Sequence, residues 1–247
     1  MPKPYLIMLP GWGMKKFIWN KLKKFLIEDF ELVLVDWHEI NSMDEFKKRV
    51  LDIMEKKKIR VFSLLGWSLG SLVALDIASD KSLSIENLFL IGSTSCFVEH
   101  KEYGCTAGWN KRIIERMKSQ LYRHPEQTMH KFYNSMFSIQ EKQKNYDMRF
   151  LEIAEDSTEN LSIDSLITGL NYLIQKDLRS VLPDINIPTL LIHGEKDSIC
   201  PLYAGLYIKN MIPNSRIEII KNGGHIPIFT NPEDCCNVLS QFTTGTI

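Results

Sequence analysis

Residues 61–70 read VFSLLGWSLG, and this stretch decides the fold. An apolar, strand-like run stops at Gly66, Ser68 follows two positions later, and Gly70 completes the pattern G-x-S-x-G of a nucleophile elbow. In an elbow a strand turns sharply into a helix, and the glycines lack a Cβ because backbones pass close to the turn. We expect Ser68 to be strained, with its hydroxyl pointing out of the sheet, at the start of a helix over residues 68–79, whose amino-terminal dipole favours an oxyanion. An ordinary tight turn is the alternative, but the flanking strand and helix favour the elbow.

Strand-like and helix-like segments alternate on both sides of the elbow. Apolar runs typical of buried strands lie at residues 5–9, 31–35, 87–91, 188–192 and 216–220. Helical patterns lie at residues 15–27, 43–58, 202–211 and 231–242, and Asn231 and Pro232 favour an N-cap and a first helical position. This alternation predicts an α/β fold with a mostly parallel central sheet and helices on both faces.

The alternation stops between residues 99 and 178, where the composition becomes helical and charged. Candidate helices in this segment lie at residues 107–122, 126–138, 140–154 and 164–176. An all-helical insertion between two strands is expected to cap the carboxyl end of the sheet, where open α/β sheets bind ligands. The predicted organisation is therefore a core of residues 1–98 and 179–247 with a helical cap of residues 99–178. A bulky surface insertion is the alternative.

The composition of the chain excludes several classes of protein. Thirty basic and thirty acidic residues cancel, so no overall field attracts nucleic acid or an anionic membrane. The five cysteines form no C-x-x-C pair and, being odd in number, predict neither a disulfide framework nor a zinc site. No apolar stretch approaches the roughly 18 residues of a membrane span. We expect a soluble protein of the reducing cytoplasm.

Three side chains fall at the carboxyl ends of predicted strands in the order Ser68, Asp197, His225. This is the chain order of an α/β-hydrolase triad. The serine hydroxyl needs a base because it is a weak nucleophile at neutral pH, and the imidazole needs a carboxylate to fix its tautomer. The glycines at 223 and 224 are expected to let the loop bring the imidazole over the serine.

Each of these residues also has a simpler interpretation. His225 could be a solvated loop histidine and Asp197 a turn residue, but their joint spacing with the elbow favours the triad. Other candidate catalytic groups lack a supporting pattern: His193, Asp184, Cys96 and Cys105. His193 lies at a strand end and is interpreted as structural.

The oxyanion hole is expected to use two backbone amides. One belongs to Leu69, which follows the nucleophile, and the other to Trp12 in the loop Pro-Gly-Trp-Gly after the first strand. The indole of Trp12 either covers the reacting ester or packs in the core.

Several segments together carry a resemblance to a known family. They are PGWGM at residues 10–14, LGWSLG at 65–70, SCF at 95–97, GLNYLIQKDL at 169–178 and GEKD at 194–197. Over nearly its whole length, the chain resembles the pimeloyl-acyl-carrier-protein methyl ester esterases of biotin synthesis. The elbow and triad specify only the α/β-hydrolase superfamily. Within it, the esterase family is indicated by the Gly-Trp-Gly loop, the tryptophan before the nucleophile and the Ser-Cys-Phe segment. The chain departs from the family pattern at residues 36–39, which read DWHE, and at Ser71, where glycine is frequent.

The resemblance implies hydrolysis of a methyl ester by the triad, without a metal or an organic cofactor. We expect a monomer. It implies an acyl-carrier protein as partner, and substrate contacts from Trp12, Phe132, Met136 and His225. Lys131 and Lys144 match positions that are basic in the family and are expected to contact the carrier protein. Residues 111–149 hold nine basic and four acidic residues, so the cap is locally positive, although a solvated helical face would look the same.

Two other functions remain open. A generalist short-chain carboxylesterase, or another enzyme of the same fold such as a lyase, would share the triad. A non-catalytic binding protein of this fold usually has a broken triad or elbow, whereas both are intact in this sequence.

Overall fold

A computed structural model describes residues 2–99, 108–158 and 162–245. Within these residues, a six-stranded sheet has the order β2-β1-β3-β4-β5-β6, and every neighbouring pair is parallel. The strands are β1 (Tyr5–Leu9), β2 (Glu31–Leu34), β3 (Val61–Trp67), β4 (Ser84–Ile91), β5 (Thr189–Gly194) and β6 (Ser215–Ile220). The parallel sheet expected from the alternating pattern is confirmed.

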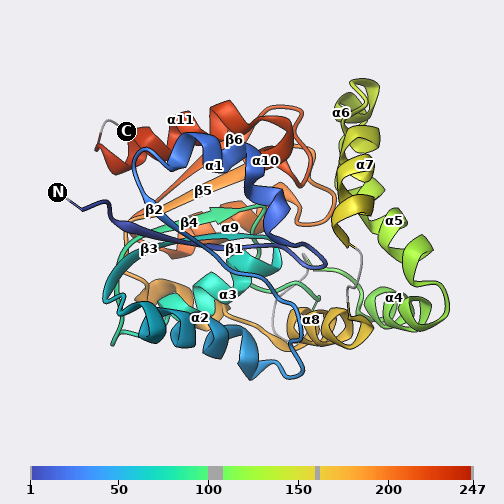
Figure 1. The fold of residues 1–247 in the computed structure, drawn as a ribbon, viewed down its shortest axis with the longest axis horizontal. Coiled ribbons are helices and arrows are strands. Elements are labelled where there is room, and N and C mark those ends of the chain that lie inside the picture. The colour runs from blue at the N-terminus through green and yellow to red at the C-terminus, as the bar shows by residue number, and fades with distance from the viewer. Residues whose placement is uncertain (1, 100–107, 159–161, 246–247) are drawn as a thin grey trace.

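Helices cover both faces of the sheet (Figure 1). They are the 3₁₀ helix η1 (Lys16–Trp19), then α1 (Asn20–Leu26), α2 (Asp44–Lys57), α3 (Leu69–Ala78), α9 (Leu202–Met211), α10 (Pro227–Thr230) and α11 (Pro232–Thr243). Helices α1 and α11 lie on one face and α2 and α3 on the other. The helix expected over residues 15–27 is thus divided into a 3₁₀ turn and a short α-helix. Asn231 occupies the N-cap position of α11 without a side-chain capping bond, and its Oδ1 accepts the Thr230 hydroxyl.

Burial along the strands follows from this covering. The central strands β1, β3 and β5 are buried over nearly their whole length and β4 over its second half, whereas the edge strands β2 and β6 are partly exposed. A strand covered on both faces must be apolar throughout, which explains the continuous hydrophobic runs in the sequence. In the part of the chain that the structure describes, no helix is both long and apolar enough to cross a bilayer.

A helical insertion lies between β4 and β5, beside the end of the sheet where the strands finish (Figure 1). Its helices are α4 (Lys111–Arg123), α5 (Pro125–Ser135), α6 (Ile139–Gln143), α7 (Tyr146–Thr158) and α8 (Ile163–Gln175), followed by the 3₁₀ helix η3 (Arg179–Asp184). The helix expected over residues 140–154 is two helices, because Asn145 between them has a left-handed φ of 57°. Cys105 and the expected helix start at residue 107 lie outside the described residues.

Candidate active site

Ser68 joins β3 to α3 in the conformation expected of an elbow. Its φ of 55° and ψ of −120° are strained for a residue with a side chain. A Cβ on Gly66 would lie 2.4 Å from the Gly70 carbonyl oxygen, and one on Gly70 would lie 2.0 Å from the Leu9 carbonyl oxygen. Both glycines are therefore required by close backbone approach. Ser71, where the family often has glycine, donates its hydroxyl to the Ser68 carbonyl at 2.6 Å and braces the turn.

The three side chains singled out in the sequence lie in one hydrogen-bonded chain. His225 Nε2 is 2.8 Å from Ser68 Oγ, and His225 Nδ1 is 2.7 Å from Asp197 Oδ2. Asp197 Oδ1 accepts the backbone N–H groups of Ile199 and Cys200, both at 2.9 Å. Because the carboxylate can only accept, Nδ1 carries the proton and Nε2 is free to accept one from the serine. The arrangement is suited to general-base activation of a hydroxyl nucleophile.

Trp67 and Gly92 also position the imidazole, and sequence reasoning assigned them no such role. The indole Nε1 of Trp67 donates to the His225 carbonyl at 2.8 Å, and its ring lies 5.6 Å from the imidazole. Gly92 has a φ of 51°, and a Cβ there would approach His225 Nδ1 to 3.1 Å. Trp67 was part of the family resemblance, but no local pattern reveals that its indole would reach a loop 158 residues away.

The other residues weighed as catalytic candidates have different surroundings. His193 is fully buried, and its Nε2 donates to the Cys200 carbonyl at 2.6 Å and lies 3.6 Å from Asp197 Oδ2. Burial lowers the pKa of His193, although the nearby Asp197 carboxylate opposes this effect. A neutral His193 therefore supports the loop that holds Asp197. Asp184 is exposed and lies 3.9 Å from Lys81. Cys96 is buried, with its thiol directed to the Val98 carbonyl.

Leu69 and Trp12 occupy positions at which their amides are available. Leu69 is the first residue of α3, where backbone N–H groups have no acceptor within the helix. Trp12 lies in a turn closed by the bond from Met14 N–H to the Gly11 carbonyl. Its indole donates to the Leu166 carbonyl on α8 at 2.8 Å and meets the Phe132 ring edge-on at 4.8 Å. Their shared oxyanion role stays a prediction.

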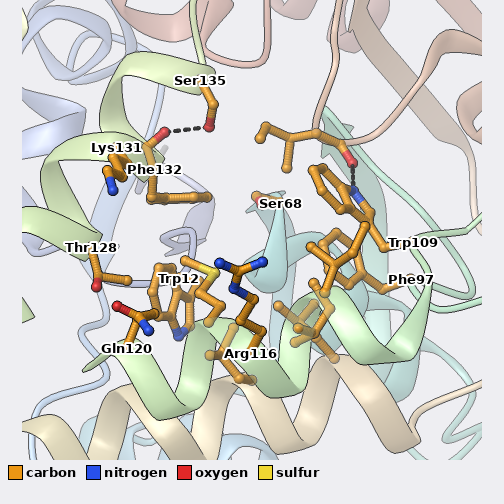
Figure 2. Close-up of a pocket in the computed structure, with 16 residues that line it drawn as sticks. Trp12, Ser68, Phe97, Trp109, Arg116, Gln120, Thr128, Lys131, Phe132 and Ser135 are labelled. Atoms are coloured by element: carbon orange, nitrogen blue, oxygen red, sulfur yellow. Dashed lines mark hydrogen bonds between the residues drawn. The ribbon is translucent and has the colours of Figure 1, made fainter. Parts of the chain in front are cut away.

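A pocket of about 410 Å³ opens onto Ser68 between the sheet and the helical insertion (Figure 2). Its volume lies within the roughly 300–1,000 Å³ of small-molecule sites. The walls are mainly apolar and include Phe97, Trp109 and Phe132, whereas Arg116 and Lys131 supply positive charge. Figure 2 shows the guanidinium of Arg116 directed into the pocket. The pocket can therefore hold an apolar chain whose reactive end reaches the serine hydroxyl.

Of the other residues that the resemblance implied as contacts for substrate or carrier protein, only some line the pocket. Phe132 and Lys131 line the pocket, whereas Met136 is fully buried and is absent from its lining. The expected contact of the Met136 side chain with substrate therefore gains no support. The Met136 carbonyl accepts the backbone N–H of His225 at 2.7 Å. Lys144 is exposed at the end of α6, away from the pocket lining. Among the residues that the structure describes, no cluster of three His, Cys, Asp or Glu side chains could hold a metal.

A family model described as the alpha/beta hydrolase fold matches residues 4–232. This chain belongs to the α/β-hydrolase fold family. The hydrolase is 30% identical over 244 residues to a pimeloyl-[acyl-carrier protein] methyl ester esterase of Wigglesworthia glossinidia brevipalpis, covering 96% of this chain and 92% of the relative. It is 28% identical to the protein of the same name from Nitrosomonas europaea, covering 93% and 92%. The resemblance drawn from the sequence is thereby confirmed.

Solved structures agree on the fold. An esterase from Exiguobacterium antarcticum superimposes with a TM-score of 0.87 at 21% identity, covering 98% of this chain and 92% of that one. An enol-lactonase from Burkholderia xenovorans LB400 gives 0.86 at 15% identity, covering 99% and 92%. The family match and the curated relatives make the hydrolase a carboxylic ester hydrolase.

Proposed function

We propose that this hydrolase removes the methyl group from pimeloyl-acyl-carrier-protein methyl ester, a step of biotin synthesis, through an acyl-enzyme on Ser68. The observation that carries the proposal is the chain of bonds from Asp197 through His225 to Ser68, at 2.7 and 2.8 Å, beneath an apolar pocket. The activity for which the relatives are named supplies the choice of substrate.

In the proposed mechanism, His225 Nε2 takes the Ser68 hydroxyl proton as Oγ attacks the ester carbonyl carbon. The amides of Leu69 and Trp12 stabilise the tetrahedral oxyanion. When the intermediate collapses, the C–O bond to methoxide breaks and the imidazolium gives the leaving group its proton, which releases methanol. Water then repeats the sequence on the acyl-enzyme and frees a carboxylic acid and the serine. Asp197 stabilises the imidazolium in both halves.

The pocket supports the choice of a long, apolar acyl chain. Each methylene removed from water contributes about 0.8 kcal/mol, so walls such as Phe97, Trp109 and Phe132 favour a polymethylene chain over a short acyl group. With the methyl ester at Ser68, the chain would run along these walls towards the carrier protein outside.

The helical insertion is proposed to act as a cap that binds this carrier. On this proposal, residues 99–178 form the cap and residues 1–98 and 179–247 the core. Of the four acidic residues between positions 111 and 149, Glu141 is buried and Glu115 is paired with Lys118 at 2.9 Å, whereas Lys131 and Lys144 are exposed. Residues 111–149 of the cap therefore carry an excess of positive charge, which would attract an acidic carrier protein.

The proposal is tested by complementation of a biotin-auxotrophic strain that lacks this esterase. The wild-type gene should restore growth without biotin and the Ser68→Ala gene should not. In vitro, kcat/KM for the carrier-linked methyl ester should exceed that for short free methyl esters such as methyl butyrate. Failure to complement, together with equal kcat/KM values for both substrates, would instead identify a generalist carboxylesterase.

A further inference from the structure

The loop that carries His225 is bonded to a segment of the helical insertion, which we call the latch segment (residues 135–141). Its Glu141 accepts the Gly224 N–H through Oε2 at 3.0 Å, across a sequence separation of 83 residues. The Ser138 hydroxyl donates to the Asn222 carbonyl at 2.7 Å. Next to these bonds, His225 N–H donates to the Met136 carbonyl at 2.7 Å. The latch segment therefore bonds the backbone at positions 222, 224 and 225.

The latch segment also reaches the second catalytic loop. Ser198, the residue after Asp197, donates its hydroxyl to the Ser135 carbonyl at 3.0 Å. The loops carrying the proposed base and its carboxylate are thus tied to one short stretch that runs from the end of α5 into α6. Movement of this stretch would shift the imidazole relative to Ser68 Oγ.

Glu141 has the central place in the latch segment. The carboxyl group is buried, and Oε2 also accepts the Ser138 N–H at 2.8 Å, which closes a capping box at the start of α6. Its Oε1 is buried without a hydrogen-bond partner among the described residues. Burial of a half-satisfied carboxyl group is unfavourable, so packing alone would be better served by an apolar side chain. An apolar side chain could not accept the N–H groups of Ser138 and Gly224, which Oε2 bonds at the same time.

Gly224 fits the same interpretation. A Cβ there would lie 2.4 Å from the Met136 carbonyl oxygen, 2.6 Å from Glu141 Oε2 and 2.8 Å from Ser138 N. Gly224 is not among the glycines with positive φ. The glycine is needed because the latch segment lies against it, rather than for freedom of the loop to swing.

We propose that Glu141 is a positioning residue, which holds His225 in line with Ser68 by fixing the Gly224 amide. The inference rests on the proposed role of His225 but is independent of the acyl chain that the enzyme accepts. A misplacement of about 1 Å in a catalytic group can reduce the rate roughly 100-fold. We therefore expect Glu141→Ala to lower kcat for p-nitrophenyl acetate roughly 10- to 100-fold, with KM changed less than about twofold.

Two variants separate positioning from a merely structural effect. Glu141→Gln keeps one acceptor oxygen for Gly224 and Ser138 and should recover most of the lost kcat. Asn110→Ala removes the side-chain cap of α4, which accepts the Arg112 N–H at 3.0 Å, and does so in the same helical insertion without touching the His225 loop. This control should lower the thermal midpoint without lowering kcat. The deshielded proton signal of His225 Nδ1–H, followed by NMR, should weaken in Glu141→Ala and persist in Asn110→Ala.

Gly224→Ala provides a test from the other side of the contact, and decides the matter if Glu141→Ala does not fold. Its added methyl group should push the loop from the latch segment and lower kcat at unchanged KM. Native kcat in either folded variant, or an equal loss in Glu141→Ala and Asn110→Ala, would overturn the inference. His225→Ala tests the proposed function separately: an active His225→Ala enzyme refutes the triad, whereas an inactive one beside a fully active Glu141→Ala enzyme refutes only the latch.

Discussion

Asp197→Asn changes a single atom of the proposed triad, and the structure determines how that atom must be placed. In the wild type, Oδ2 faces His225 Nδ1 at 2.7 Å while Oδ1 accepts two backbone N–H groups at 2.9 Å. Asparagine has one acceptor oxygen and one NH₂ donor, so it can satisfy only one side of this arrangement.

The side-chain amide should adopt the orientation that places its oxygen at the Oδ1 position. It keeps both bonds from Ile199 and Cys200, whereas the flipped orientation would direct the NH₂ at two buried donors. The NH₂ group then faces His225 Nδ1 and forces that nitrogen to accept. The imidazole proton moves to Nε2, which can no longer take the proton of Ser68 at 2.8 Å.

The loss of the base should reduce kcat by about 10⁴-fold, equivalent to roughly 5.5 kcal/mol of transition-state stabilisation. Because the pocket is untouched, KM should change little. The measurement is steady-state hydrolysis of a p-nitrophenyl ester, with the fold checked by circular dichroism. Asp197 orients the base and does not itself react, so this loss should be smaller than that in Ser68→Ala.

Asp184→Asn is the matched control, since Asp184 is the other carboxylate that the sequence offered. It is exposed and 3.9 Å from Lys81, so its removal should leave kcat within twofold of the wild type, about the size of a surface effect. Full activity in Asp197→Asn would refute the assignment of the carboxylate. A large loss in Asp184→Asn would point to that residue instead.

Three further outcomes are expected. Ser68→Ala should lower kcat by about 10⁶-fold while the thermal midpoint stays near that of the wild type, and a smaller loss on p-nitrophenyl esters would point to another nucleophile. Lys144→Glu should raise KM for the carrier-linked ester at low salt without affecting a small free ester, and it is a cleaner test than Lys131→Glu because Lys131 lines the pocket. Burial lowers the pKa of His193 in the folded state, so below about pH 6.5 the unfolded state takes up a proton that the folded state does not. The free energy of unfolding should fall by up to about 1.4 kcal/mol per pH unit as the pH drops, and urea titrations of His193→Gln should show a shallower dependence.

The parts of the site that could be predicted from sequence are those that depend on residues close together in the chain. The elbow requires glycines at fixed positions around Ser68, because helix α3 approaches Leu9 and β3 so closely that a Cβ has no space. The strand ends before Asp197 and His225 are marked by apolar runs that stop at glycine-containing loops. Patterns of this kind depend on neighbours in the chain, so a single sequence suffices to read them.

The parts that could not be predicted depend on contacts between distant segments. Met136 was expected in the substrate pocket, yet its side chain is fully buried and its carbonyl supports His225. Asn231 has the right residue type for an N-cap, but its oxygen accepts the Thr230 hydroxyl and makes no capping bond to a backbone N–H. The burial of the Met136 side chain and the bond of the Asn231 oxygen both depend on the surrounding fold, and nothing in the local pattern shows either of them.

The position of the His225 imidazole in the proposed triad therefore depends on both the sheet and the helical insertion. Trp67 on β3 fixes the carbonyl of His225, while Met136 on the insertion fixes its amide, each through a bond of 2.7 or 2.8 Å. One bond holds the carbonyl of His225 and the other holds its N–H, so neither the sheet nor the insertion alone determines where the imidazole lies. Ser68 is strained by the elbow and cannot move towards a displaced base without disturbing β3 and α3. The distance between the imidazole and Ser68 Oγ therefore depends on the position of the loop at residues 222–225. The helical insertion lines the pocket and also holds this loop through hydrogen bonds.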